Sequence, residues 1–173
     1  MNNADARKLI EKGVNSSGEK SIWADLGCGN GPFTNALAEL LGTGSTIFAI
    51  DQTTTDNFPT SDRVEIQFQK LNFEKDDLPF AKINGILMVN SLHCIKDKPK
   101  LLQKLRNHLR KNGTLIIIEY DTQASNAWVP YPIPFQKLEE TLKQVGFKHI
   151  QKIGERQSIY RREKIYACVS EKD

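Results

Sequence analysis

The sequence predicts one α/β domain built around a mostly parallel sheet. Apolar runs of strand length alternate with amphipathic helical patterns along the chain. Several of these runs are apolar at successive positions, as is required of parallel strands that are covered on both faces. The length of 173 residues agrees with a single domain, since domains average roughly 150 residues. We therefore treat residues 1–173 as one unit.

Composition and charge exclude several classes of protein. The chain is 39% hydrophobic and 26% charged, which is ordinary globular usage, and its net charge of +3 is well below that of a dedicated nucleic-acid binder. Cys28, Cys94 and Cys168 have no partners at zinc-ligand spacing. Residues 1–12 lack the features of a signal or transit peptide, and no apolar run approaches the ~20 residues that cross a bilayer. We expect a cytoplasmic protein with no metal and no membrane association.

The first half of the chain supplies four strands and two helices. A short amphipathic helix at Ala4–Lys12 is joined by the linker Gly13–Lys20 to the first strand. Residues 1–20 either cover one end of the sheet or act as a mobile lid over a ligand. The strands that follow, and the helix between the first two, are predicted at Ser21–Asp25, Pro32–Leu41 (helix), Thr46–Asp51, Val64–Lys70 and Ile83–Asn90.

The second half ends differently from the first. A helix at Lys98–Leu109, closed by Asn112-Gly113, precedes a strand at Leu115–Asp121, and a helix at Phe135–Val145 ends before Gly146. The last two runs, His149–Arg156 and Lys164–Ser170, alternate apolar with polar residues and are too close together for a helical crossover, so they predict an antiparallel hairpin. The whole pattern predicts a three-layer, Rossmann-like sheet of about seven strands, the first five parallel.

A glycine-rich turn follows the first strand and opens directly into a helix. It reads Asp25-Leu26-Gly27-Cys28-Gly29-Asn30-Gly31-Pro32. Glycines allow close approach of a ligand, and free N–H groups at the helix start favour an anionic or accepting group. Asp25 would repel a pyrophosphate but would bind an ammonium, so the turn favours an amino-acid moiety. Asp51, 20 residues beyond Gly31, can accept hydrogen bonds from both hydroxyls of a ribose.

These residues resemble the class I S-adenosylmethionine-dependent methyltransferases, and most of all their small single-domain members. The resemblance runs from Ile22–Thr34 through Ile50-Asp51-Gln52 to the terminal hairpin. It implies S-adenosyl-L-methionine as the cofactor.

The resemblance also implies roles for individual residues. Gly27, Cys28 and Gly29 would line the methionine end, with Asp25 near the amino group. The remaining cofactor residues would be Asp51 at the ribose, Gln52, Asn72 and Phe73 at the adenine, and Asn90 after the fourth strand. Asn72 stands where the family often has an acid, and its side-chain oxygen could accept from the adenine amine.

Methyl transfer from a sulfonium mainly requires alignment of the acceptor, so no catalytic residue is obligatory. An acceptor that must lose a proton gains from a base, and His93 is our candidate, with Glu119 or Tyr120 bonding the polar group of the acceptor. The structural alternative for His93 is a histidine held by a backbone partner. We interpret Cys94 as a small buried residue rather than a nucleophile. The segment around it lacks the Asn-Pro-Pro-aromatic signature of enzymes that methylate exocyclic adenine nitrogens or glutamine amides.

A proline-rich loop follows the fifth predicted strand. Its Trp128 and Tyr131 are candidates for the wall of an acceptor site, and the alternative is a stiff surface connection.

Basic residues gather on the helix at Lys98–Leu109, Lys104 among them, and at Arg161 and Arg162. We interpret the helix lysines as a solvated face, because its leucines must point inward and no aromatic residue interleaves the lysines. We therefore predict a methyltransferase that acts on a small molecule, with nucleic acid disfavoured. The alternatives are an enzyme acting on RNA or protein, a non-catalytic cofactor-binding module and a nicotinamide oxidoreductase. The sequence favours no oligomeric state.

Overall fold

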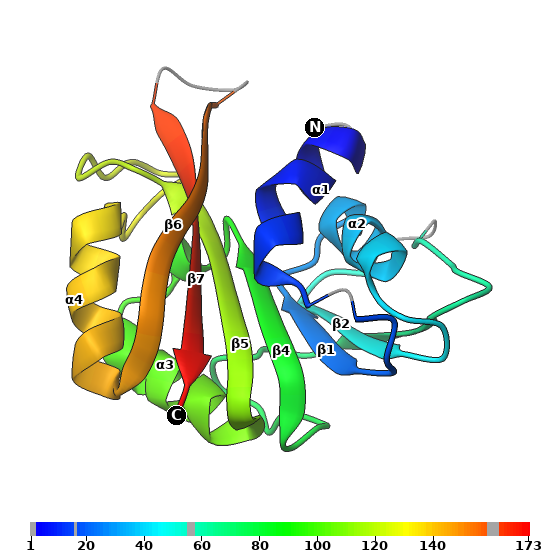
Figure 1. Cartoon of the computed structure of the whole chain (residues 1–173). Helices are drawn as coiled ribbons and strands as arrows, with labels where there is room; N and C mark the ends of the chain where they lie inside the picture. The colour runs from blue at the N-terminus through cyan, green and yellow to red at the C-terminus, as the bar shows by residue number, and fades with distance from the viewer. Residues whose placement is uncertain (1–2, 16, 55–57, 159–162) are drawn as a thin grey trace.

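The computed structural model describes residues 3–15, 17–54, 58–158 and 163–173. In this part of the chain seven strands form one sheet in the order β3-β2-β1-β4-β5-β7-β6 (Figure 1). The strands are β1 (Ile22–Leu26), β2 (Thr46–Asp51), β3 (Glu65–Lys70), β4 (Ile83–Val89), β5 (Leu109–Tyr120), β6 (Phe147–Gln157) and β7 (Lys164–Lys172). Strands β1 to β5 are parallel, and β7 is antiparallel to both β5 and β6. The predicted sheet is confirmed.

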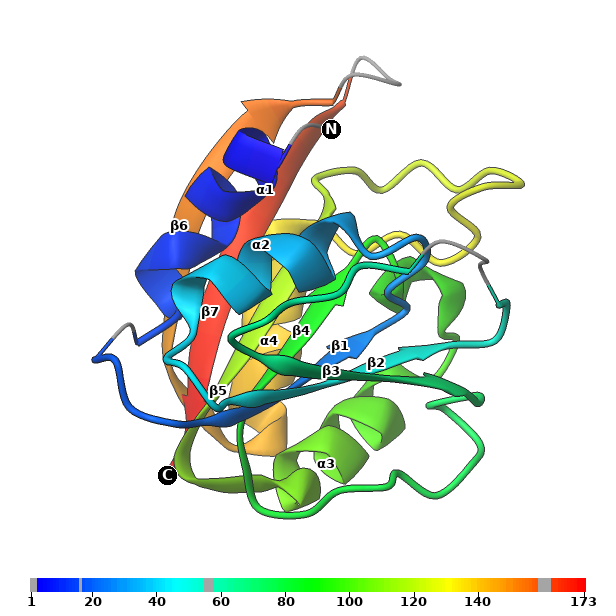
Figure 2. The ribbon, with the colours of Figure 1, turned by 90° about the vertical axis from the view of Figure 1, so that its right-hand side faces the viewer.

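Helices cover both faces of the sheet. They are α1 (Asn3–Ile10), α2 (Pro32–Leu40), α3 (Lys98–His108) and α4 (Phe135–Val145), with 3-10 turns η1 (Glu11–Gly13) and η2 (Leu92–Cys94). Figures 1 and 2 show α1 and α2 on one face and α3 and α4 on the other. Each face has its own apolar core: Leu37 and Ile10 pack with Trp23 on the first, and Leu102 and Leu142 are buried on the second.

Helix α1 lies beside α2 in the layer that covers one face of the sheet (Figure 1). Its Ala6 and Ile10 are fully buried, and Asp5 lies 3.2 Å from the Arg156 guanidinium on β6. Helix α1 is thus packed against the sheet layer, and the role of residues 1–20 as a cover or a mobile lid stays a prediction.

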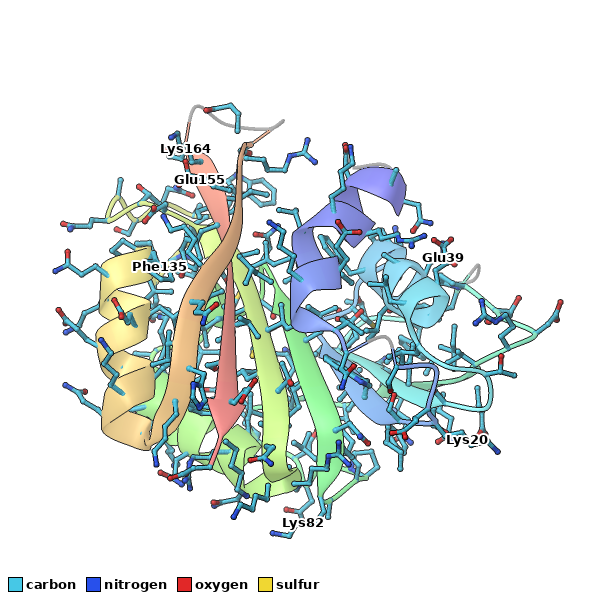
Figure 3. The ribbon with its side chains drawn as sticks, in the orientation of Figure 1. Lys20, Glu39, Lys82, Phe135, Glu155 and Lys164 are labelled. Carbon is cyan, nitrogen blue, oxygen red and sulfur yellow. The ribbon has the colours of Figure 1, made fainter. Side chains whose placement is uncertain are left out.

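The hairpin of β6 and β7 closes one side of the sheet, as predicted. Lys164 Nζ donates to Glu155 Oε1 at 2.6 Å across the two strands (Figure 3). Tyr166 on β7 is fully buried and donates from its hydroxyl to the Ile133 carbonyl at 2.8 Å, which fastens the loop before α4.

Strand β5 begins six residues earlier than predicted. Helix α3 ends at His108, and Asn112 and Gly113 lie inside the strand rather than closing the helix. Leu109 is buried and pairs with Ile83, after which the register shifts. Asn112 takes a φ of 57°, so the chain makes a bulge there and then resumes regular pairing. Burial of Leu109 thus decides the boundary against the local Asn-Gly signal.

The order of the strands locates the site. From β1 the chain moves outward on one side to β2 and β3, whereas β4 lies on the other side of β1. In open α/β sheets, ligands bind beyond the carboxyl ends of the strands at this reversal. The residues that follow β1, β2, β3 and β4 therefore meet at one edge. In the described ranges of the chain, no helix is long and apolar enough to cross a membrane.

Candidate functional site

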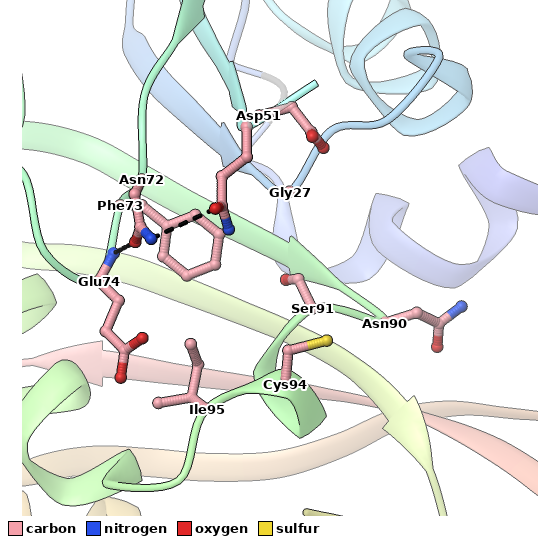
Figure 4. Close-up of a pocket in the computed structure, with 10 residues that line it drawn as sticks. Gly27, Asp51, Asn72, Phe73, Glu74, Asn90, Ser91, Cys94 and Ile95 are labelled. Carbon is pink, nitrogen blue, oxygen red and sulfur yellow. Dashed lines mark hydrogen bonds between the residues drawn. The ribbon is translucent and has the colours of Figure 1, made fainter. Parts of the chain in front are cut away.

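Two adjoining hollows open at the reversal of strand order. The larger has a volume of about 260 Å³ (Figure 4). It is lined by Gly27, Asp51, Gln52, Asn72, Phe73, Glu74, Asn90, Ser91, Cys94 and Ile95. The smaller, of about 200 Å³, is lined by Asp25, Gly27, Cys28, Pro32, Phe33, Val89 and Asn90. Of the predicted cofactor residues only Gly29 lines neither hollow, and its N–H bonds Asp51, which does.

Gly27 is required by geometry at the start of the turn. Its φ is 79°, which L side chains rarely adopt, and a Cβ at this position would lie 2.6 Å from Ser91 Cβ. Ser91 is held in turn by a 2.8 Å hydrogen bond from its hydroxyl to the Leu26 carbonyl. The turn after β1 and the segment after β4 therefore touch, and only glycine permits the contact.

The first three N–H groups of the glycine turn, which precede the helix, are bonded within the protein. Gly27 N and Cys28 N both donate to the Ile50 carbonyl, at 2.8 and 3.1 Å, and Gly29 N donates to Asp51 Oδ2 at 2.9 Å. These backbone donors are used to fasten the turn to the end of β2, as buried donors generally must be.

Asp25 carries an unsatisfied oxygen at the smaller hollow. The residue is 1% exposed, and its Oδ2 accepts a 2.6 Å hydrogen bond from the Thr34 hydroxyl, whereas Oδ1 has no partner in the described part of the chain. Burial raises the pKa of Asp25 to about 7; the Thr34 bond opposes that rise and the charge of Asp51 adds to it. A cationic donor at this point would satisfy Oδ1 and favour the carboxylate.

The Asp51 carboxylate accepts more hydrogen bonds from the protein than we expected. Its Oδ2 accepts from Gly29 N, and its Oδ1 accepts from both the N–H and the hydroxyl of Thr53, each at 2.9 Å. A carboxylate offers about four acceptor positions, so roughly one remains. Binding of two ribose hydroxyls requires the Thr53 hydroxyl to rotate away.

The turn after β3 forms one wall of the larger hollow. Asn72 Oδ1 accepts from Glu74 N at 3.0 Å and Lys75 N at 3.2 Å, and Asn72 Nδ2 donates to Gln52 Oε1 at 3.3 Å. The oxygen expected to accept from an adenine amine is thus occupied by the backbone. The Phe73 N–H, by contrast, meets no acceptor among the described residues. Glu74 also lines this wall and was not predicted as a site residue; an acid directly after Asn72-Phe73 was the available signal.

His93 is held by a carboxylate rather than by a backbone partner. Glu119, at the end of β5 and 1% exposed, accepts from His93 N at 3.0 Å, and its other oxygen lies 2.8 Å from His93 Nδ1. Since an ionised carboxylate only accepts, this contact places a proton on Nδ1 and leaves Nε2 as the other ring nitrogen. The ring of Tyr120 lies 6.1 Å from the ring of His93. The three predicted catalytic residues are therefore neighbours, with both oxygens of Glu119 directed to His93.

Cys94 is exposed, which corrects the interpretation of it as a buried residue. The 3-10 turn η2 directs Leu92 into the core and Cys94 toward the larger hollow (Figure 4). Partial desolvation and the nearby Glu119 raise the pKa of its thiol above the usual value.

The loop between β5 and α4 is fastened beside His93. Tyr131 N donates to the His93 carbonyl at 3.0 Å, and the Tyr131 carbonyl accepts from Lys98 Nζ at 2.7 Å. The Trp128 side chain is 80% exposed and that of Tyr131 41% exposed, and neither lines the two hollows. Their role as an acceptor wall stays a prediction.

The basic residues of α3 do not form a simple solvated face. Lys98 is buried, and desolvation lowers its pKa. Lys104 Nζ bonds backbone carbonyls of the turn after β3, and Arg106 bonds the Gly146 carbonyl. Three cations of the suggested nucleic-acid track are thus used within the protein. Arg161 and Arg162 lie outside the described residues.

Comparison with known proteins gives a family match and similar folds. A family model described as a methyltransferase domain matches residues 17–167. Phospholethanolamine N-methyltransferase 2 of Haemonchus contortus superposes with a TM-score of 0.77 at 12% identity, over 98% of this chain and 52% of that one. The chain thus spans about half the length of the Haemonchus protein. No protein with a curated description matches the chain in sequence.

Two further structures are covered more fully. A putative S-adenosylmethionine-dependent methyltransferase from Listeria monocytogenes has a TM-score of 0.69 and 16% identity, over 98% of this chain and 99% of that one. The 1,6-didemethyltoxoflavin-N1-methyltransferase of Burkholderia thailandensis has a TM-score of 0.73 and 18% identity, over 98% of this chain and 77% of that one. At these identities the likeness shows the fold.

Proposed function

The chain belongs to the class I S-adenosylmethionine-dependent methyltransferases, and on this basis we propose that it transfers a methyl group to a small-molecule acceptor. The observation that carries the proposal is the pair of hollows at the carboxyl ends of β1 and β4, near a loop that is bonded to the His93 carbonyl. Such hollows suit a small acceptor better than an open basic surface would. The small-molecule enzymes among the similar structures agree with this choice.

The hollows fit the cofactor at both of its ends. The unsatisfied Asp25 oxygen offers a partner for the ammonium of the amino-acid moiety. Asp51 lines the larger hollow, where it can accept from a ribose hydroxyl. Gln52 and Phe73 would face the adenine, together with the Phe73 N–H, which has no partner among the residues that the structure describes. We assign the methionine end to the smaller hollow and the adenosine to the larger one.

The chemistry supplied by the bound cofactor is an electrophilic methyl group on a sulfonium, whose leaving group becomes neutral. The protein has to align the acceptor and exclude water. We assign to His93 Nε2 the removal of a proton from the acceptor, and to Glu119 the orientation of the imidazole through Nδ1. Tyr120 and the loop residues Trp128 and Tyr131 would border the acceptor. The free state of Cys28, Cys94 and Cys168 supports a cytoplasmic location.

The test is direct. The protein is purified from cells under native conditions, and the released ligand is identified by mass spectrometry. We expect S-adenosylhomocysteine or S-adenosylmethionine, with a small acceptor or its methylated product retained beside it. The protein is then incubated with methyl-labelled cofactor and either a small-molecule extract or an RNA and protein fraction. Label that enters only the RNA and protein fraction would refute the small-molecule assignment.

A further inference from the structure

Lys104 on α3 reaches the turn that forms the wall of the larger hollow. Its ammonium donates to three backbone carbonyls: those of Phe73 at 3.0 Å, Glu74 at 3.5 Å and Asp76 at 2.5 Å. An ammonium has three donors, so this one group spends its full capacity on residues 73–76. The sequence alone predicted that this lysine lies on the solvated face of the helix.

The opposite side of the same turn is held by its own side chains. Asp76 Oδ2 accepts from Asn72 N at 2.7 Å, and Asn72 Oδ1 accepts from the N–H groups of Glu74 and Lys75. The Phe73 N–H is the donor of this turn that stays without a partner among the described residues. The carbonyls bonded to Lys104 and the Phe73 N–H, unpartnered in the described part of the chain, thus belong to one turn, and Figure 4 shows its residues Asn72, Phe73 and Glu74 at the wall of the hollow.

The Phe73 side chain is packed in the core, whereas Glu74 and Lys75 border open space. A surface hollow of about 540 Å³ lies between the turn and α3. It is lined by Glu74, Lys75, Asp97, Lys100, Leu101 and Lys104. Leu101 and Leu105 on either side of Lys104 are buried in the core, so the helix that carries the lysine is fixed. The lysine therefore ties a fixed helix to a turn that has a cavity behind it.

We propose that Lys104 is a positioning residue that holds the Phe73–Asp76 turn in the conformation that reads the adenine ring. The inference rests on the proposed cofactor site. The contacts support this role because a protein that adopts its binding-competent conformation only part of the time binds its ligand more weakly by that fraction. Without the ammonium, three carbonyls lose their common donor, and the backbone at Glu74 and Lys75 can shift into the space behind it.

The experiment measures cofactor affinity and not turnover, so it requires no acceptor. Isothermal titration gives the Kd of S-adenosylhomocysteine and of S-inosylhomocysteine for wild type, Lys104→Met, Lys104→Arg and Lys100→Met. Lys100 lies on the same helix and lines the same surface hollow, but its side chain makes no contact of this kind in the described residues, so it is the matched control for loss of charge. Thermal unfolding without ligand shows whether each variant is folded.

Lys104→Met is expected to weaken S-adenosylhomocysteine binding by on the order of tenfold, as when a tenth of the molecules stay competent. The ratio of the Kd for S-inosylhomocysteine to the Kd for S-adenosylhomocysteine should shrink as well. Lys100→Met should keep the Kd for S-adenosylhomocysteine and this ratio within about twofold of wild type. A merely structural lysine would lower both affinities alike and leave the preference unchanged. Lys104→Arg, which keeps the charge, should recover most of the loss. If Lys104→Met does not fold, the Kd values of Lys104→Arg are compared with those of wild type instead.

The outcomes separate the two proposals. If wild type binds neither ligand, the proposed function fails. If wild type binds and Lys104→Met shows the same affinity and the same preference, the role of Lys104 is refuted while the cofactor site stands. An equal loss in Lys100→Met would also overturn it, since the effect would then come from charge alone.

Discussion

The Thr34 hydroxyl donates a 2.6 Å hydrogen bond to one carboxylate oxygen of Asp25, while the other oxygen, also buried, has no partner in the described part of the chain. The carboxylate is therefore only half satisfied. Burial raises its pKa from 3.8 to about 7. Between pH 3.8 and about 7, and in the absence of ligand, the folded protein consequently favours a proton there that the unfolded chain releases.

The first prediction concerns stability and pH. Because the folded-state pKa of Asp25 is raised, its stabilising contribution is present at low pH and is lost as the pH rises toward and through 7. Asp25→Asn removes this dependence. The free energy of unfolding of the variant relative to wild type should rise by roughly 2 to 3 kcal/mol between pH 5 and pH 8. Urea unfolding at the two pH values measures it, and parallel curves for the two proteins would count against a raised pKa.

The second prediction concerns the ligand at the same residue. An ammonium binds the carboxylate and not the acid, so the affinity for S-adenosylhomocysteine should increase as the pH rises from 5.5 through about 7. Asp25→Asn should bind more weakly at pH 8 and show a flat profile across this range. Titration calorimetry in buffers of matched ionic strength gives both curves. A wild-type affinity that falls with rising pH would contradict the placement of the ammonium.

The third prediction concerns Asp51. Asp51→Ala removes the acceptor of Gly29 N and of a ribose hydroxyl, and should weaken S-adenosylhomocysteine binding by about 2–5 kcal/mol. Thr53→Val is the matched variant, because it frees Asp51 Oδ1 from one hydrogen bond without removing the carboxylate. Its affinity should stay equal or increase. Asp51→Ala with wild-type affinity would remove Asp51 from the site, and a large loss in Thr53→Val would show that its hydroxyl does not have to rotate away.

The fourth prediction compares two glycines with the same backbone angle. Gly27 and Gly18 have φ values of 79° and 78°, but a Cβ on Gly18 meets nothing within 4 Å, whereas one on Gly27 would lie 2.6 Å from Ser91 Cβ. Gly18→Ala should therefore cost only the backbone strain of roughly 1–2 kcal/mol. Gly27→Ala should cost roughly 1–3 kcal/mol more, since the turn and η2 must separate. Thermal and urea unfolding of both variants measures the difference, and equal losses would mean that the contact with Ser91 carries no constraint.

Much of the fold was predictable because it depends on patterns that the chain displays locally. The apolar runs gave the strands, and the short polar segment after Arg156 gave the hairpin. Asp25 and Asp51 were found because each ends a strand beside the glycine turn, and parallel strands bring their ends to one edge. Only the start of β5 was placed six residues too late, because Leu109 is buried and pairs with Ile83 ahead of the Asn112-Gly113 bulge.

The errors at the site have a common physical cause. Whether a side-chain oxygen is available to a ligand depends on hydrogen-bond donors that are distant in sequence or on the exact conformation of a turn. Asn72 Oδ1 accepts from the backbone N–H groups that follow it, and both oxygens of Glu119 are directed to His93, which is 26 residues away in the sequence. The exposure of Cys94 depends on the phase of a three-residue turn, which no periodic pattern in the sequence reports.

The last prediction separates catalysis from cofactor binding. Neither His93 nor Glu119 lines the two hollows, so His93→Gln and Glu119→Gln should leave the Kd of S-adenosylhomocysteine within about threefold of wild type. If His93 removes a proton from the acceptor, His93→Gln should lower kcat by about 10²–10⁴ with the acceptor identified by co-purification. Glu119→Gln should lose less, because the ring stays but its Nδ1 no longer meets a carboxylate. The pH profile of kcat decides between a base and a structural histidine: a base gives wild type a rising limb that His93→Gln lacks, whereas a structural residue changes the rate by the same factor at every pH.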